Sequence, residues 1–277
     1  MKMNVLPIGT MIRDHSEENL YPFLDFLAEL GMNCCQICRM PEEKLAANGE
    51  NEESRKFTGY LREKGIEPIS IFLNLRVRTG GNGLVSPAER AARFVFCCRQ
   101  MAWGAKHGVK YFTCHAGVFP KCGTPEYAAW VADMKELVKF AGDLGEDFLF
   151  ETGPESADDL KQTILDIDEK NVGVNFDPAN LLIYDQTDPA EFVEKLFPHI
   201  RLVHCKDARR PLDGAAHGKE TVLGEGDTNF FPLLDSILAK GFRGPLVIER
   251  EIPAGEQFRK DVSESYAKLA ALRGKYV

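Results

Sequence analysis

Short apolar runs alternate with amphipathic helical patterns eight times along this chain. The runs are continuously apolar, which is typical of parallel strands that are covered on both faces. We expect strands at residues 4–11, 32–38, 66–74, 109–115, 147–151, 172–177, 200–205 and 245–249. We expect the helices that follow them at residues 16–31, 41–64, 86–108, 124–145, 156–169, 188–196, 230–240 and 255–273. Such a series predicts a parallel sheet covered by helices.

Eight strand–helix units close most simply into a (β/α)₈ TIM barrel, an α/β fold. The alternative is an open doubly wound sheet, which normally has fewer strands and carries a G-x-G-x-x-G turn after its first strand. That turn does not follow the first apolar run here, and no Gly/Ser/Pro linker interrupts the series. A chain of 277 residues is also an ordinary length for one barrel. We therefore predict a single domain over residues 1–277.

The net charge and the cysteine positions limit the classes of binding partner and the cellular compartment that we expect. A net charge of −8 argues against nucleic acid, and no run of 18 apolar residues predicts a membrane span. The N-terminus lacks a signal-peptide pattern. Most of the eight cysteines lie inside apolar runs, and the C-x-x-C formed by Cys35 and Cys38 lies within a predicted strand, which disfavours a redox or zinc role. We expect a cytoplasmic protein with a small-molecule partner.

Ionisable residues stand at the ends of four apolar runs. The runs "DFLFE", "GVNFD", "RLVH" and "LVIE" end in Glu151, Asp177, His204 and Glu249. These positions are the C-terminal ends of the fifth to eighth predicted strands, and barrel active sites are built at that face. Because neighbouring strands lie about 5 Å apart, we expect the four side chains to converge on one half of the barrel mouth. Cys205 should then point to the opposite face from His204.

A divalent metal explains this convergence. Three clustered carboxylates would otherwise repel one another, which would raise their pKa values. We interpret the four residues as ligands of one ion, and this donor set favours Mn²⁺, Mg²⁺ or Co²⁺ and is compatible with Zn²⁺. Taken singly, each acid also suits the N-cap of the next helix, and His204 suits a core position. Glu251 is an alternative ligand to Glu249.

Further polar residues lie at or just after strand ends, where barrel loops carry specificity. We expect the following to contribute to substrate binding: His115, Asn180, Lys206, Asp207 and Arg210. For His115 an orienting hydrogen bond inside the barrel is an equally good interpretation, and at least two of the charged residues after His204 suit ordinary surface positions. The segment "LGEGDTNF" (223–230) fits either a loop over the site or a plain turn.

Five segments together resemble a known family. "FLFETGPES", "GVNFDPANLL", "VHCKDA", "LGEGDTNF" and "GPLVIEREI", in this order, are similar to the xylose isomerase-like TIM barrels. Within that superfamily they resemble the sugar phosphate isomerase/epimerase group, which includes the D-tagatose and D-psicose 3-epimerases, hydroxypyruvate isomerase and inosose dehydratase. The resemblance is densest over residues 109–252. It is specific for the superfamily and weak for the substrate.

The resemblance implies that Glu151, Asp177, His204 and Glu249 bind one divalent cation, and that the two glutamates are the catalytic acid and base. It also matches Arg210 to an arginine that contacts substrate in the ketose epimerases.

Two positions depart from the epimerase pattern. Asn180 stands where those enzymes tend to carry a histidine, and Ala157 stands where they carry a second glutamate. Both departures weaken an assignment as a free-ketose 3-epimerase without affecting the metal ligands.

We therefore expect a metal-dependent sugar isomerase or epimerase that forms a cis-enediolate of a small ketose or related polyhydroxy carbonyl. The alternatives are a dehydratase of the inosose or dehydroshikimate type on the same scaffold, and a non-catalytic sugar-binding barrel. A DNA-repair endonuclease of the same superfamily is disfavoured, because that chemistry uses a histidine-rich metal cluster and this chain has six histidines in all. A homo-oligomer, dimer or tetramer, is compatible with this expectation.

Overall fold

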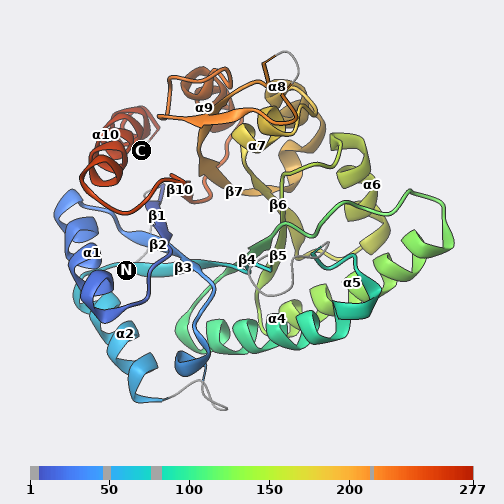
Figure 1. Ribbon diagram of the computed structural model, residues 1–277, viewed down its shortest axis with the longest axis horizontal. Helices are drawn as coiled ribbons and strands as arrows, with labels where there is room; N and C mark the ends of the chain where they lie inside the picture. Colours follow the sequence, from blue (N-terminus) through green and yellow to red (C-terminus); the bar gives the residue numbers. More distant parts are fainter. Residues whose placement is uncertain (1–5, 46–50, 76–82, 213–214, 277) are drawn as a thin grey trace.

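The computed structural model describes residues 6–45, 51–75, 83–212 and 215–276. Its centre is a closed barrel of parallel strands in the order β1-β10-β7-β6-β5-β4-β3-β2 (Figure 1). The barrel strands are β1 (Ile8–Ile12), β2 (Cys34–Cys38), β3 (Glu67–Phe72), β4 (Tyr111–Cys114), β5 (Asp147–Glu151), β6 (Val172–Phe176), β7 (Ile200–Cys205) and β10 (Leu246–Ile248). The predicted (β/α)₈ fold is thus confirmed.

Helices surround the barrel and cover its outer face (Figure 1). They are α1 (Glu17–Leu30), α2 (Glu52–Glu63), α4 (Pro87–His107), α5 (Pro125–Asp143), α6 (Ala157–Ile167), α8 (Pro189–Leu196), α9 (Phe230–Ala239) and α10 (Glu256–Arg273). Shorter elements, not predicted from the sequence, are the 3₁₀ turns η1 (Glu42–Lys44) and η2 (Phe197–His199), the helix α7 (Pro178–Ile183) and the antiparallel pair β8 (Asp207–Arg209) and β9 (Lys219–Thr221).

Side chains of each strand alternate between the barrel interior and the helix layer. In β7, Leu202 packs inside the barrel against Leu149 and Val247. Val203 and Cys205 belong instead to the main core that the helices cover. His204 therefore faces the interior, and Cys205 lies on the opposite face, as predicted.

The close packing of two barrel strands requires a glycine at one position of β1. Gly9 of β1 pairs with Cys34 of β2. A β-carbon at this position would lie 2.1 Å from the Cys34 carbonyl oxygen, which is far closer than any side chain allows. Glycine is therefore required where these two strands meet.

One predicted helix is shorter than expected. The polar stretch 41–64 contains the turn η1 and then α2, which begins at Glu52. The side chain of Asn51 accepts a hydrogen bond from the Ser54 amide, so Asn51 caps α2 and sets its first residue. Residues 46–50 of the predicted helix lie outside the described residues. The predicted helix is thus confirmed over α2, and the capping bond of Asn51 decides where this helix begins.

The two cysteines of the C-x-x-C lie on opposite faces of β2. Cys35 belongs to the core under the helices, whereas Cys38 packs inside the barrel with Met11 and Phe72. In the described part of the chain both thiols are free, and burial raises their pKa values. Within the same residues, no helix is long and apolar enough to cross a membrane.

A buried carboxyl group at the N-terminal end of β5 makes the stability of the fold depend on pH. Glu146 precedes β5 and is buried, and neither of its carboxylate oxygens has a hydrogen-bond partner among the described residues. Burial raises the pKa of Glu146 to about 9. The folded chain thus keeps a proton that the unfolded chain releases near its ordinary pKa of 4.5. The free energy of unfolding is therefore highest below pH 4.5. It falls as the pH rises toward 9, because the unfolded chain is then favoured by its ionised glutamate.

We therefore predict that Glu146→Gln raises the free energy of unfolding at pH 8 by roughly 1–3 kcal/mol. The two proteins should have nearly the same stability at pH 4.5, where the glutamate is protonated. Urea unfolding across this pH range measures the difference. Glu18→Gln, at an exposed position of α1, is the control and should change little at either pH. An equal effect of Glu146→Gln at both pH values would contradict the prediction.

Candidate metal centre

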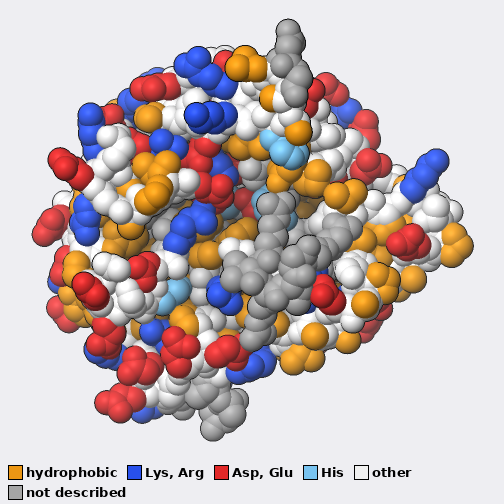
Figure 2. Space-filling model, viewed as in Figure 1, with side chains coloured by type: hydrophobic (Ala, Val, Ile, Leu, Met, Phe, Trp, Pro, Cys, Tyr) orange, Lys and Arg blue, Asp and Glu red, His pale blue; other side chains and the backbone are white. Residues whose placement is uncertain are grey.

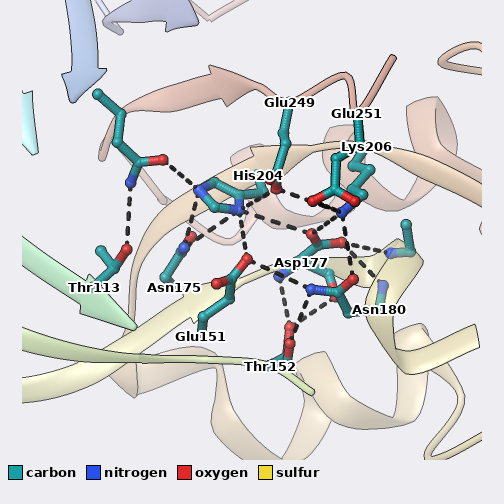
Figure 3. A network of polar contacts seen from close by, with 12 residues as sticks. Thr113, Glu151, Thr152, Asn175, Asp177, Asn180, His204, Lys206, Glu249 and Glu251 are labelled. Carbon is teal, nitrogen blue, oxygen red and sulfur yellow. Dashed lines mark hydrogen bonds and ion pairs between the residues drawn. The ribbon is translucent and has the colours of Figure 1, made fainter. Parts of the chain in front are cut away.

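Four side chains converge inside the C-terminal mouth of the barrel. Glu151 ends β5, Asp177 follows β6, His204 lies near the end of β7, and Glu249 follows β10. One potential ligand atom from each residue lies within 4.8 Å of the others, and all four residues are buried. Figure 3 shows them grouped around the imidazole of His204. The structure thus brings together the four residues that the sequence places at strand ends.

The imidazole lies between the two glutamates. His204 Nδ1 is 2.9 Å from Glu151 Oε1 and 2.9 Å from Glu249 Oε2. It lies 3.7 Å from Asp177 Oδ2. Burial alone would lower the pKa of His204, but the carboxylates of Glu249 and Glu151 outweigh this effect and hold that pKa well above its usual value. Without a cation, this cluster depends on a protonated histidine.

The unpaired oxygens of the cluster fit a divalent metal. Glu151 Oε2, Asp177 Oδ2 and Glu249 Oε2 are buried and have no hydrogen-bond partner among the described residues. Buried polar atoms normally make a hydrogen bond, so three oxygens in one place that have only ion-pair contacts need an explanation. Carboxylate oxygens with one imidazole are the donors that Mg²⁺, Mn²⁺ and Co²⁺ accept. The donor set therefore fits such an ion.

The sequence allows Asp177 to be either a helix N-cap or a metal ligand, and its two carboxylate oxygens are placed for both. Its Oδ1 accepts hydrogen bonds from the amides of Ala179 and Asn180, which caps α7. Its Oδ2 is left free for the cluster. The capping bonds hold the carboxylate in place, so capping and ligation support each other.

Gln36 of β2 determines which nitrogen of His204 faces the cluster. The amide nitrogen of Gln36 donates to Ser70 Oγ at 3.0 Å, so its oxygen is turned toward His204. His204 Nε2 lies 2.8 Å from this Oε1 and donates to it, so in the neutral ring that binds a metal the proton is on Nε2 and Nδ1 is the ligand atom. The Asn175 amide nitrogen lies 3.0 Å from the same Nε2, and Asn175 Oδ1 makes no hydrogen bond among the described residues, so turning this amide over would let Oδ1 accept from Nε2 as well.

Two cationic side chains balance the carboxylates. Lys206 Nζ lies 3.6 Å from Glu249 Oε2 and 3.7 Å from Asp177 Oδ2. Arg13, which follows β1, donates to Glu249 Oε1 and lies 3.5 Å from Glu251. Burial alone would raise the pKa of Glu249, but Lys206 and His204 outweigh it and hold that pKa well below its usual value. Glu249 thus has one oxygen held by Arg13 and one turned to the cluster.

His115, Asn180 and Lys206 lie beside the cluster, as the sequence predicts. His115 Nε2 is 3.2 Å from Glu151 Oε2. The Asn180 side chain donates to the Thr152 carbonyl at 3.2 Å and accepts from Lys206 Nζ at 3.5 Å. His115, Glu151 and Glu249 line a cavity of about 100 Å³. His115 is therefore placed to meet a molecule in that cavity, whereas Asn180 and Lys206 contact the cluster itself.

Asp207 and Arg210, also expected to bind substrate, are engaged elsewhere. The Asp207 carboxylate accepts hydrogen bonds from the amides of Gly224, Gly226 and Thr228 and from the Thr228 hydroxyl, so it holds the loop 224–228. Arg210 is 41% exposed and pairs with Asp185 and Asp188. The structure does not bring these two residues into the cluster.

Sequence reasoning missed three residues of the site. Gln36 interrupts the apolar run "CCQIC", and Arg13 follows the run that forms β1, so both left a detectable signal. Glu155 is buried near His115, its Oε1 accepts from the Gly153 amide, and burial raises its pKa to about 8. It follows its strand by four residues and resembles an ordinary loop acid in the sequence.

We predict that the purified protein binds one divalent ion per chain and that Asp177→Ala and His204→Ala each abolish this binding. Both changes remove a donor that no neighbouring side chain replaces. Metal analysis after dialysis against Mn²⁺ measures the content. Asp207→Asn, outside the cluster, is the control and should retain the ion. Full occupancy in both alanine variants would exclude these residues as ligands.

We also predict that Gln36→Leu lowers metal affinity by roughly 10- to 100-fold, the usual effect of losing the partner that orients a metal-bound histidine. Competition with a fluorescent chelator measures the affinity. Gln100→Leu is the matched control, because Gln100 is equally buried but its amide holds the backbone of Met40. It should reduce stability and leave the metal affinity unchanged. Equal affinities for Gln36→Leu and the parent protein would contradict the prediction.

Comparisons with known proteins agree with this fold. A curated relative, the inosose dehydratase of Clostridium botulinum (strain Alaska E43 / Type E3), is 27% identical over 134 residues, which are 43% of this chain and 45% of that protein. The chain thus spans about half the length of the curated relatives it matches.

Three solved structures are similar over nearly the whole chain. A xylose isomerase domain protein from Planctomyces limnophilus has a TM-score of 0.85 at 27% identity and covers 99% of both chains. A xylose isomerase-like TIM barrel protein from Mycobacterium smegmatis in complex with magnesium has a TM-score of 0.76 at 18% identity, covering 98% of this chain and 97% of that one. A D-tagatose 3-epimerase-like protein has a TM-score of 0.72 at 20% identity and covers 96% of both. The last two likenesses show the fold alone.

The family profile of the xylose isomerase-like TIM barrels matches residues 24–269, which is most of the chain. Together with the closed barrel of parallel strands, this match shows that the chain belongs to the xylose isomerase-like TIM barrel family.

Proposed function

We propose that this protein is a divalent-metal-dependent sugar isomerase or epimerase that acts through a cis-enediolate of a small ketose or related polyhydroxy carbonyl. The observation that carries the proposal is the pair of buried glutamates, Glu151 and Glu249, each 2.9 Å from the same nitrogen of His204. Each also has one carboxylate oxygen without a hydrogen-bond partner among the described residues. A similar fold in a D-tagatose 3-epimerase-like protein supports the same class of reaction.

A bound Mn²⁺, Mg²⁺ or Co²⁺ would supply Lewis-acid stabilisation of negative charge on substrate oxygens. Glu151, Asp177, His204 and Glu249 would hold it. The centre is buried, so the charge that develops on the substrate meets fixed partners rather than water. We assign the orientation of substrate hydroxyl groups to His115, Asn180 and Lys206, which lie beside the cluster with polar atoms at its edge.

The two glutamates suit proton transfer on opposite faces of a substrate carbon. They come from β5 and β10, and β6 and β7 stand between these strands in the barrel. Epimerisation needs one group to remove the proton from one face and a second group to return a proton on the other. Isomerisation needs the proton to be moved between neighbouring carbons, which one of the two can do.

A dehydratase is the second candidate. The curated relative from C. botulinum is an inosose dehydratase, and its reaction class begins with the same proton removal next to a carbonyl. Lys206 is the observation that favours this alternative. Its buried ammonium lies 3.6 Å from Glu249, and Glu249, Asp177 and Glu251 outweigh burial and hold the pKa of Lys206 above its usual value. An ammonium in this position stays charged and can donate a hydrogen bond to a departing β-hydroxyl, which stabilises the charge that develops there.

We predict that turnover in D₂O places deuterium at the carbon whose configuration or oxidation level changes. A carboxylate that has taken the substrate proton exchanges it with solvent before returning it. A panel of ketoses, aldoses and inososes incubated with Mg²⁺-loaded protein and followed by NMR and mass spectrometry provides the measurement. A product lighter by one water identifies the dehydratase instead. A product formed without solvent deuterium would point to a hydride shift and rule out this acid–base assignment.

On the substrate found by that panel, Glu151→Gln and Glu249→Gln should each lower kcat by roughly 10²–10⁴-fold, the usual contribution of general acid–base catalysis. Metal content has to be measured for both variants, so that a lost proton acceptor is separated from a lost ion. Glu251→Gln is the matched control, because Glu251 is 52% exposed and lies at the edge of the same cluster. It should retain kcat within a few-fold. If either substitution within the pair leaves kcat unchanged, that glutamate transfers no proton.

A further inference from the structure

A second cavity lies beside the candidate metal centre, between the beginnings of α1 and α10. It has a volume of about 290 Å³, close to the lower end of the roughly 300–1,000 Å³ typical of small-molecule sites. Its lining includes Met11, Arg13, Phe23, Ile252, Phe258 and Arg259. We call it the α1–α10 cavity. Nothing in the proton-transfer chemistry proposed above requires it.

The α1–α10 cavity shares a wall with the metal centre. Arg13 lines both this cavity and the smaller one next to the cluster, and its guanidinium is bonded to Glu249. Met11, which lines the α1–α10 cavity, packs against Phe72, which lines the smaller one. A molecule held at the cluster therefore has the α1–α10 cavity as its neighbour on the Arg13 side.

The surfaces that remain available in the α1–α10 cavity are apolar and aromatic. The rings of Phe23 and Phe258 lie 5.8 Å apart, and both are half-buried. Figure 2 shows hydrophobic side chains gathered between α1 and α10, next to the charged groups at the barrel mouth. This arrangement presents ring faces and edges to an occupant.

The polar side chains of the cavity are mostly engaged with their neighbours. The carboxylate of Asp14 accepts hydrogen bonds from Ser16 and Asn19. The guanidinium of Arg259 lies over the ring of Phe26, 4.7 Å from its centroid. An occupant therefore gains chiefly from apolar contact rather than from a charge.

From this geometry we infer that the α1–α10 cavity is a subsite for a flat apolar substituent of the substrate, so that the substrate class is an aryl-substituted polyhydroxy ketone, such as an aryl glycoside with a keto group in its sugar ring, rather than a free sugar. The sugar would lie at the metal centre, and in that respect the inference rests on the proposed function. A second copy of the chain would contact the same phenylalanines. A concave cavity that borders the reaction centre suits a small group better than a protein surface.

The test compares two ligands that differ only in the substituent, phenyl β-D-glucoside and methyl β-D-glucoside. Mg²⁺-loaded protein labelled with ¹³C in its methionine methyl groups is titrated with each, and the Met11 resonance is assigned with Met11→Leu. Phenyl glucoside should shift this resonance with a Kd about tenfold or more below that of methyl glucoside, because the phenyl ring leaves water. Neither ligand has to be turned over.

Phe258→Ala should abolish the preference for the phenyl ligand while the metal content stays unchanged. Phe140→Ala is the matched control, because Phe140 is a half-buried phenylalanine on α5, outside this cavity, and it should keep the preference. Phe258→Leu keeps an apolar side chain and should retain part of it, which guards against misfolding of the alanine variant.

Equal affinities for the two glucosides, or a preference that survives Phe258→Ala, would overturn the inference. So would a sedimentation experiment in which Phe258→Ala dissociates an oligomer while the phenyl ligand leaves Met11 unperturbed, because the cavity would then be an interface between copies. Protein that binds no metal but still prefers the phenyl ligand would instead refute the proposed function and leave the subsite standing.

Discussion

The burial of three carboxylates around one imidazole is the constraint on which the rest of this structure depends. One carboxylate oxygen of each of Glu151, Asp177 and Glu249 lies within 4.8 Å of the others, and all three residues are buried. Like charges at such distances are costly in a protein interior unless opposite charges compensate them. Arg13 and Lys206 provide part of that compensation. One oxygen of each acid makes no hydrogen bond among the described residues, so the cluster could hold a further cation.

Holding these charges in place requires partners from most of the barrel. His204 is oriented by Gln36, which is 168 residues away in the sequence and is itself held by Ser70. Asp177 is fixed by the first amides of α7, so this short helix holds one carboxylate of the cluster in place. A closed barrel is well suited to this task, because its interior places side chains from distant strands in one layer.

Periodicity and strand ends predicted the barrel and the four clustered residues, because parallel strands in a barrel share one C-terminal face. Contacts across the barrel were not predictable in this way. Gln36 looked like an interruption of an apolar run, and only the fold shows that it meets His204. Asp207 looked like a substrate residue for the same reason that Asp177 looked like a ligand. Its loop, however, turns four donors onto it, and that geometry depends on residues 224–228.

The two glutamates are placed alike but are not equivalent. Glu249 has Arg13 on one oxygen, whereas the free oxygen of Glu151 faces His115 across 3.2 Å. The Glu249 carboxylate is therefore held by the Arg13 guanidinium. The Glu151 carboxylate instead borders His115, whose ring could turn toward a substrate hydroxyl group. Arg13 also lines the α1–α10 cavity. A molecule bound in that cavity would therefore contact the residue that holds Glu249. Recognition of a substituent and alignment of a catalytic carboxylate would thus pass through one side chain.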